Sequence, residues 1–223
     1  MLNPQFNLNY LNGFLVVFNK QARLLVKEFA QMERKGDNFR PFLDIFFDLK
    51  ESVGDEKMPD NTIRDHVNSL ILAGHDTVAI AVQLTLLLVG SYPEVQERLY
   101  TELVDVFGDS NQDVEKDDLT RLHYLDAVLK ESLRFYTMAP IVARYVAEDL
   151  KLKNYTLKAG GACILMLYGV HRLPMWGKDV EEFKPERWLD PAALPENPNA
   201  FLPFSLGKRV CIAALIGCFI KLN

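Results

Sequence analysis

The spacing of apolar and polar residues separates a helical part of the chain, residues 1–140, from a part with short strands and turns, residues 141–223. Helical periodicity, with Gly36 as a stop and Pro93 in a first turn, predicts helices over about 11–35, 41–50, 61–90, 93–107 and 120–136. Segments of strand character cover 141–146, 150–152, 155–157 and 162–167, and Gly160-Gly161 marks a turn. The pattern predicts a mainly α fold with a small β-sheet, in one partial domain.

The segment from Val67 to Val89 is largely apolar and long enough to cross a bilayer. It also carries several polar residues, and an Asp at the bilayer centre costs about 2.5–3.5 kcal/mol. We therefore expect a long helix buried in a protein core rather than a membrane span. The polar residues in question are Asn68, His75, Asp76 and Gln83.

Composition narrows the function classes only a little. The chain has 223 residues, with 25% charged residues and a net charge of −5, which gives no support for nucleic-acid binding. Its three cysteines, Cys163, Cys211 and Cys218, are few and odd in number, so we expect a reducing compartment and no disulfide framework. Residues 1–12 lack a basic segment followed by an apolar core, so no signal peptide or anchor is predicted there.

The most informative segment is Phe204–Cys211, which precedes an apolar stretch, residues 212–222, predicted to be a helix. Free backbone N–H groups at a helix start favour a thiolate on Cys211. Gly207 permits a tight turn close to a flat ligand, and Arg209 can pair with an acidic group on that ligand. These features point to haem, because one cysteine can be its protein axial ligand, whereas structural zinc takes about four ligands. The alternative is a buried cysteine beside a surface arginine.

This segment resembles the cysteine-ligand loop of the cytochrome P-450 family, the haem-thiolate monooxygenases. The family pattern is Phe-x-x-Gly-x-Arg-x-Cys-x-Gly, which Phe204, Gly207, Arg209 and Cys211 match. The last position is Ala213, where the added methyl lies close under the macrocycle by the resemblance. The resemblance implies that Cys211 ligates the iron of haem b.

A second motif, Ala73-Gly74-His75-Asp76-Thr77, lies on the predicted long helix. The Thr77 hydroxyl can bond back to the Ala73 carbonyl, and an acid beside a hydroxyl is a plausible proton relay; a core helix with satisfied polar residues is the alternative. By the resemblance, Ala73 and Gly74 make room for the haem, while Thr77 stabilises bound dioxygen and, with Asp76, delivers protons. Some relatives have a Glu at the position of Ala73 that is esterified to haem, so no such covalent bond is expected here.

Glu131 and Arg134, three residues apart on a predicted helix, face the same side. Alone this pair is uninformative, but the family joins it to an arginine in a segment similar to Lys184–Trp188. The resemblance therefore implies a buried structural triad of Glu131, Arg134 and Arg187 that locks the irregular segment before the cysteine loop.

Four further residues have less prominent expected roles. Arg144, a charge within an apolar strand, is expected to bind a haem propionate beside Arg209. His171 matches a recurrent family position and is expected to be structural rather than a ligand. Cys163 and Cys218 are expected to be core residues.

The resemblance implies a monooxygenase that inserts one atom of O2 into a small lipophilic substrate and reduces the other to water. Electrons are expected from NADPH through NADPH–cytochrome reductase, at the cytosolic face of the endoplasmic reticulum membrane. The sequence of residues 168–190 most resembles the branch of animal fatty-acid hydroxylases and their insect relatives.

The chain is expected to be a fragment that lacks the amino-terminal half, with its membrane anchor, and the extreme carboxyl terminus of the family. Expressed alone, it should expose apolar surface and aggregate. One alternative is a truncated, non-catalytic pseudoenzyme. Another is a haem-thiolate isomerase or dehydratase that needs neither O2 nor a reductase, against which Asp76-Thr77 argues.

Overall fold

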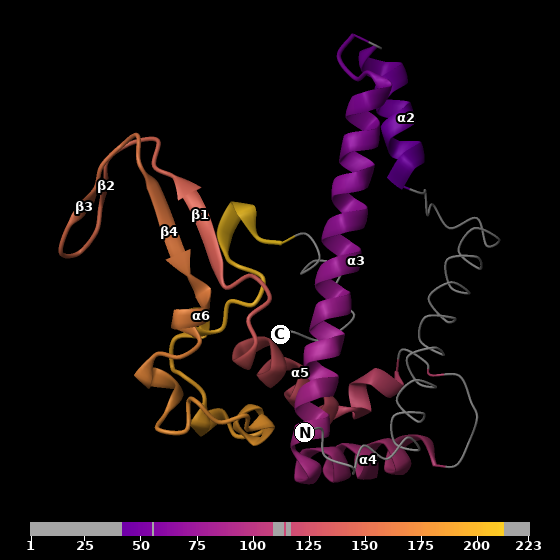
Figure 1. Cartoon of the computed structure of the whole chain (residues 1–223), viewed down its shortest axis with the longest axis vertical. Coiled ribbons are helices and arrows are strands. Elements are labelled where there is room, and N and C mark those ends of the chain that lie inside the picture. Colours follow the sequence, from indigo (N-terminus) through magenta and orange to yellow (C-terminus); the bar gives the residue numbers. More distant parts are fainter. Residues whose placement is uncertain (1–41, 55, 109–113, 115–116, 212–223) are drawn as a thin grey trace. The chain divides into compact units, whose positions relative to one another are not determined.

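The computed structural model describes residues 42–54, 56–108, 114 and 117–211 (Figure 1). The helices predicted over 11–35 and 212–222, with Ala213 and Cys218, lie outside these residues. The chain divides into two compact units, Met1–Val78 with Val104–Arg121, and Ala79–Leu103 with Leu122–Asn223. The described elements are mostly helical with short antiparallel strands, which confirms the predicted fold class.

In the first unit, helix α2 (Phe42–Val53) leads into α3 (Asp60–Ser91), which continues into the second unit. Lys50 pairs with Asp60 at the start of α3, and the Phe46 ring stacks on His66 with centroids 5.4 Å apart. The long helix expected over 61–90 is present as α3, because no proline interrupts residues 60–91. A short 3-10 turn, η1 (Asp118–Arg121), also belongs to this unit.

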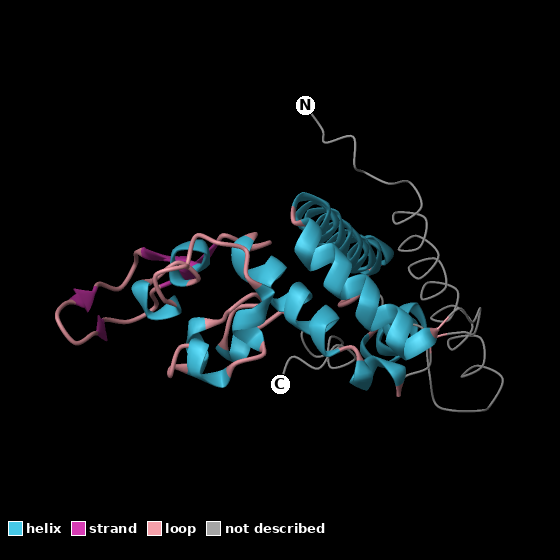
Figure 2. Ribbon diagram, turned by 90° about the horizontal axis from the view of Figure 1, so that it is seen from below, coloured by secondary structure: helices cyan, strands magenta, loops and turns pink. Residues whose placement is uncertain are grey.

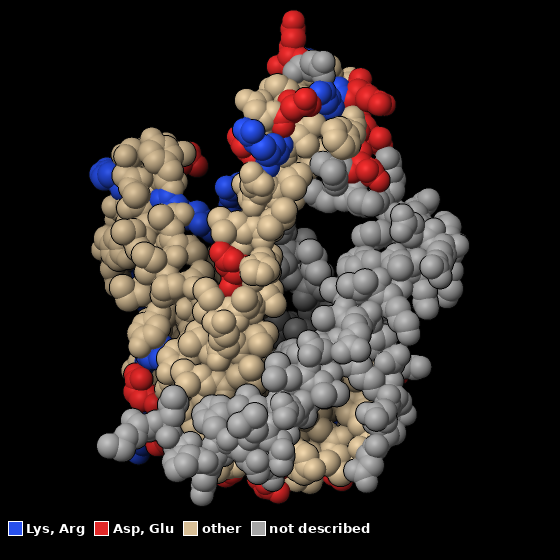
Figure 3. Space-filling model, turned by 45° about the vertical axis from the view of Figure 1, so that its right-hand side comes forward, with Lys and Arg blue, Asp and Glu red and all other residues tan. Residues whose placement is uncertain are grey.

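The middle of α3 is exposed in the structure, which differs from the expected buried core helix. Large apolar side chains such as Ile71 (62% exposed) and Leu72 (63%) face outward, and Figure 3 shows a mainly uncharged surface there. By length and composition α3 could cross a membrane. An apolar sequence indicates that a helix requires apolar surroundings, but it does not identify the segment or solvent that provides them. The burial of α3 within this chain could therefore not be predicted from its own sequence.

The second unit is built around α5 (His123–Phe135), with most of α4 (Pro93–Phe107) and the end of α3. The bounds of α4 are those predicted, since Pro93 starts the helix and Gly108, at φ +57°, follows its end. Helix α5 begins three residues later than predicted. The apolar core of the second unit contains Leu88, Leu99, Val128 and Phe183, all buried.

The strands form one long hairpin with two separate ladders. β1 (Ile141–Tyr145) pairs with β4 (Ala162–Met166), and between them β2 (Leu150–Lys151) pairs with β3 (Thr156–Leu157), both antiparallel (Figure 1). The single small sheet expected from the sequence is therefore two two-stranded sheets. Between the two ladders, the Ala159 N–H donates to the side chain of Asp149 at 2.9 Å. In a continuous ladder this N–H would donate to a backbone carbonyl instead.

After β4 the chain passes through a short helix, α6 (Leu167–Val170), and then through 3-10 turns joined by loops (Figure 2). Four of the five turns start with proline, whose fixed φ and missing N–H suit a first turn. Aromatic rings fill the space between them; Trp188 lies 4.6 Å from Phe201 and 5.7 Å from Trp176, centroid to centroid. The turns are η2 (Pro174–Trp176), η3 (Pro185–Trp188), η4 (Pro191–Ala193), η5 (Pro198–Ala200) and η6 (Gly207–Arg209).

Candidate functional site

The segment from Phe204 to Cys211 forms a loop closed by its own backbone. The N–H of Cys211 donates to the carbonyl of Phe204 at 3.0 Å, and the N–H of Val210 donates to the carbonyl of Gly207 at 3.0 Å. Ser205 (φ +67°) and Gly207 (φ +80°) both adopt left-handed backbone conformations to make the turn. Cys211 is a free, exposed cysteine at the end of this loop, so its thiol is accessible to a ligand.

Replacing Gly207 by alanine is expected to destabilise the haem-free protein by about 1–2 kcal/mol, because its φ of +80° disfavours any Cβ. Space is not the cause, since a Cβ there would meet nothing within 4 Å. The matched control is Gly161→Ala, where φ is not left-handed and the nearest atom is Lys158 O at 3.6 Å; it should change stability by less than about 0.5 kcal/mol. Thermal unfolding checks both, and equal effects would contradict the account.

Two arginines are placed at this loop. Arg144, on β1, is half-buried, and its Nη2 donates to Ser205 Oγ at 3.3 Å while its Nη1 donates to the carbonyl of Ala143 at 2.9 Å. Arg209 lies within the loop and is exposed. Strand β1 thus carries one guanidinium to the loop, and the loop itself contains a second arginine.

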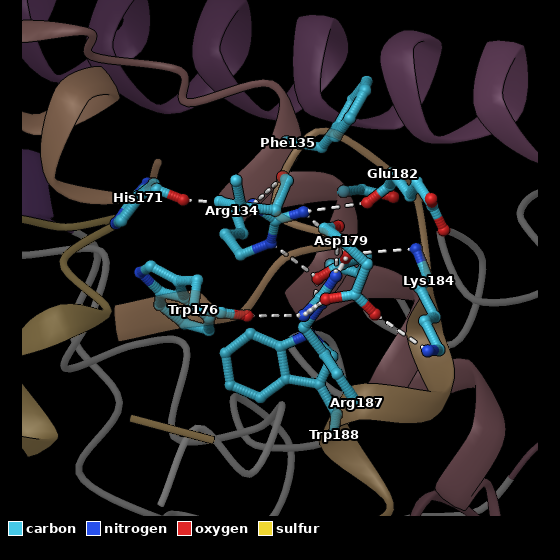
Figure 4. Close-up of polar contacts among 12 residues, drawn as sticks. Arg134, Phe135, His171, Trp176, Asp179, Glu182, Lys184, Arg187 and Trp188 are labelled. Carbon is cyan, nitrogen blue, oxygen red and sulfur yellow. Dashed lines mark hydrogen bonds and ion pairs between the residues drawn. The ribbon is translucent and has the colours of Figure 1, made fainter. Parts of the chain in front are cut away.

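The structure brings Glu131, Arg134 and Arg187 together in the interior of the second unit, with exposed fractions of 0%, 0% and 2% (Figure 4). The carboxylate of Glu131 accepts Arg134 Nε at 2.8 Å and Nη2 at 2.9 Å, and Arg187 Nε at 3.0 Å. It also accepts the N–H of Lys184 at 3.0 Å and the indole N–H of Trp188 at 2.9 Å. One buried carboxylate therefore joins α5 to both ends of η3.

The guanidinium of Arg134 also fixes three carbonyls of the irregular segment. It donates to His171 O at 3.0 Å, Val180 O at 2.9 Å and Glu182 O at 3.0 Å, and Figure 4 shows it between His171 and Glu182. Arg187 does the same with the carbonyls of Trp176, at 3.1 Å, and Asp179, at 2.9 Å. These backbone carbonyls lie outside regular ladders, so the two arginines supply donors that buried carbonyls need.

His171 is fully buried and both ring nitrogens have partners. Nε2 accepts the N–H of Leu202 at 2.8 Å, and Nδ1 lies 2.7 Å from Thr137 Oγ1. Burial, followed by the charges of Arg134 and Arg172, lowers the pKa of His171 to about 4. With both nitrogens occupied and no exposed surface, His171 is placed for a structural role rather than for ligation.

Acidification is expected to destabilise the folded protein through His171. The unfolded chain takes up a proton below pH 6.5, while the folded imidazole resists protonation down to about pH 4. The contribution is full above pH 6.5 and is lost as the pH falls toward 4, in total about 3 kcal/mol. Urea unfolding at several pH values should show a shallower loss for His171→Gln, which cannot titrate. Parallel pH profiles for the two proteins would contradict this.

The motif on α3 belongs to the first unit and is exposed. The hydroxyl of Thr77 donates to the Ala73 carbonyl at 2.6 Å, the back-bond expected from the sequence. Ser69, Thr85 and Ser91 make the same bond four residues back, so this contact alone does not distinguish Thr77. Asp76 Oδ1 lies 2.9 Å from His75 Nδ1, which pairs Asp76 with its neighbour rather than with Thr77.

Sequence reasoning missed a polar cluster that supports α5 from α4. Glu102 accepts the N–H groups of Tyr124, at 2.6 Å, and Leu125, at 2.9 Å, which caps the first turn of α5. The phenol of Tyr124 donates to Glu186 Oε1 at 2.8 Å, and Arg98 donates to the same oxygen at 2.9 Å. Burial, and then the bond to Glu186, raises the pKa of Tyr124. The sequence around α5 does not predict this cap, because Glu102 lies 22 residues before Tyr124.

Comparison with known proteins agrees with these features. Residues 7–217 match the family described as Cytochrome P450. The chain is 39% identical over 173 residues to rat cytochrome P450 4V2, which covers 78% of this chain and 33% of the relative. It is 39% identical over 172 residues to probable cytochrome P450 4d21 of Drosophila melanogaster, covering 76% and 33%. To cytochrome P450 4c21 of Blattella germanica it is 32% identical over 211 residues, covering 92% and 42%.

The chain therefore belongs to the cytochrome P450 family, the haem-thiolate monooxygenases. Its relatives include insect members, as the resemblance implied. The chain spans about a third of the length of the rat relative.

The residues around Cys211 fit the family's haem. A single exposed thiol stands at the end of a closed loop, with one guanidinium bonded to that loop and another within it. Among the described residues, no three His, Cys, Asp or Glu side chains gather as a metal site. That donor set suits a prosthetic group that brings four of its own metal ligands and takes one from the protein.

Proposed function

We propose that the whole protein is a haem-thiolate monooxygenase that inserts one atom of O2 into a small lipophilic substrate. The observation that carries the proposal is the loop from Phe204 to Cys211, closed by the bond from Cys211 N to Phe204 O and presenting an exposed thiol. Its electrons come from NADPH through a partner NADPH–cytochrome reductase. The protein acts at the cytosolic face of the endoplasmic reticulum membrane.

Each predicted residue has one role in this proposal. The Cys211 thiolate would bind the iron of haem b, which when bound would supply the oxygen-activating chemistry. Phe204 and Gly207 shape the loop, and the guanidinium groups of Arg144 and Arg209 bind the two propionates.

The residues of the α3 motif would serve the handling of oxygen and protons. Ala73 and Gly74 leave room beside the helix, because neither carries a side chain larger than a methyl. Thr77 holds a proton at Oγ1 and Asp76 exchanges protons with water at its carboxylate. For Thr77 to donate toward substrate, its hydroxyl must leave the Ala73 carbonyl, which it contacts at 2.6 Å.

The reaction is tested by supplying ¹⁸O2, NADPH and a purified reductase to the haem-loaded protein, with a panel of fatty acids and other lipophilic compounds. One labelled oxygen atom per product molecule is expected, together with dependence on NADPH and reductase. Product formed without NADPH, or without label, would favour a haem-thiolate isomerase or dehydratase instead.

A second candidate is a non-catalytic pseudoenzyme. It is favoured by the exposure of the α3 motif, since Asp76 and Thr77 face solvent and apolar neighbours such as Ile71 and Leu72 are uncovered. A haem titration of the 223-residue chain separates the two candidates. Saturable binding of one haem per chain supports the enzyme, and absence of specific binding supports the pseudoenzyme.

A further inference from the structure

His171 is held in one protonation and tautomeric state by its two partners. A backbone N–H can only donate, so the bond from Leu202 N requires Nε2 to be an unprotonated acceptor. The ring proton is therefore on Nδ1, which donates to Thr137 Oγ1 across 2.7 Å. The Thr137 hydroxyl in turn donates to the carbonyl of Arg134, at 3.3 Å. These bonds run without interruption from Leu202 to the end of α5.

Leu202 lies two residues before the loop of residues 204–211, and its own carbonyl bonds to that loop. The N–H of Ser205 donates to Leu202 O at 3.2 Å, and the N–H of Cys211 donates to Phe204 O at 3.0 Å. The start of the loop is thereby bonded to Leu202, and its end is bonded back to Phe204. Among the described residues, Arg144 on β1 and His171 make the side-chain hydrogen bonds that join residues 202–205 to another element.

The surroundings of His171 do not by themselves require an imidazole. The rings of Trp176 and Phe201 lie 6.5 Å and 5.5 Å from it, centroid to centroid, and an apolar side chain could fill such a space. The charged groups facing it, Arg134 on α5 and the adjacent Arg172, favour the neutral ring. Burying an imidazole without hydrogen bonds costs free energy. We therefore attribute the structural contribution of His171 to the hydrogen bonds made by its two ring nitrogens.

We propose that His171 is a positioning residue for the Cys211 loop, and that as the neutral Nδ1–H tautomer it ties Leu202 to Thr137 and so orders residues 202–211. The assignment of Cys211 as the ligand rests on the proposed function. The ordering of the loop does not, because it follows from bonds within the chain.

The test is amide hydrogen exchange in the haem-free protein, in the form its gene encodes, with two matched variants. His171→Gln keeps an acceptor near the position of Nε2, whereas His171→Asn keeps a donor near the position of Nδ1 and loses the acceptor. We expect exchange of the Leu202 amide to be about tenfold faster in His171→Asn, and near the original rate in His171→Gln. Exchange within α5 should be unchanged in both. Equal exchange at Leu202 in all three proteins would overturn the proposal.

A measurement on the unmodified protein is independent of whether the variants fold. Nitrogen-15 NMR of His171 is expected to show a neutral ring protonated at Nδ1. A ring protonated at Nε2 could not accept from Leu202, and would overturn the proposal.

The haem-loaded variants connect loop order with ligation. We expect the fraction of thiolate-type carbon-monoxide complex to fall in His171→Asn and to be largely kept in His171→Gln. If the unmodified protein gives no thiolate-type complex, the proposed function fails, while the exchange data still decide the role of His171. If His171→Asn gave the same fraction of thiolate-type complex as the unsubstituted protein, His171 would not position the Cys211 loop for ligation.

Discussion

Replacing Arg134 by glutamine is expected to cost about 3–5 kcal/mol of folding free energy, the largest stability effect we expect from one substitution in the described residues. The guanidinium is fully buried, makes two bonds to Glu131 and fixes the carbonyls of His171, Val180 and Glu182. Its loss leaves the buried Glu131 carboxylate with Arg187 as its one remaining cation within the triad, and three carbonyls short of a donor. Urea unfolding of the haem-loaded protein measures the loss.

The chain offers a matched control for this substitution. Arg121 also stands three residues after an acid, Asp118, at 3.6 Å, but its side chain is 55% exposed. Arg121→Gln should cost no more than about 0.5 kcal/mol, because water screens the pair. Similar losses for the two variants would contradict the assignment of the buried triad as the lock on residues 171–188.

Replacing Cys211 by serine is expected to reduce product formation per bound haem to the background measured without NADPH. A serine oxygen donates far less electron density than a thiolate, and that donation assists cleavage of the O–O bond. Product is measured with NADPH and reductase present, and the rate is divided by the haem content of each preparation.

The control is the same substitution at another cysteine. Cys163, on β4, is free and half-buried and lies opposite Arg144 in the ladder. Cys163→Ser should leave the rate per haem unchanged within about a factor of two, since no role in ligation is assigned to it. Turnover retained in Cys211→Ser, or lost equally in both variants, would be incompatible with Cys211 as the axial ligand.

The parts of the fold that could be predicted are those set by local chemistry. Pro93 and Gly108 delimit α4, a proline-free run allows α3, and Gly160, at φ +87°, makes a local turn between β3 and β4. The same holds for the back-bond of Thr77, which joins residues four apart. In each case the residues that decide the structure are neighbours along the chain, so a pattern in the sequence reports them.

The parts that could not be predicted depend on partners far apart in sequence. Trp188 reaches Glu131 across 57 positions, and Glu102 caps α5 from 22 positions upstream. The surroundings of α3 likewise depend on other segments or molecules, and the apolar residues of α3 do not identify them. The family resemblance supplied Arg187 as the third member of the triad; its bonds to the carbonyls of Trp176 and Asp179 appear only in the structure.

The central claim is that the sulfur of Cys211 binds a haem iron, and the most direct measurement is the absorption spectrum of the reduced, haem-loaded protein under carbon monoxide. We expect a Soret band shifted far to the red, which is characteristic of haem iron bound by a thiolate. A Soret band at the position given by an imidazole or by water, in freshly prepared protein with full haem content, would contradict it.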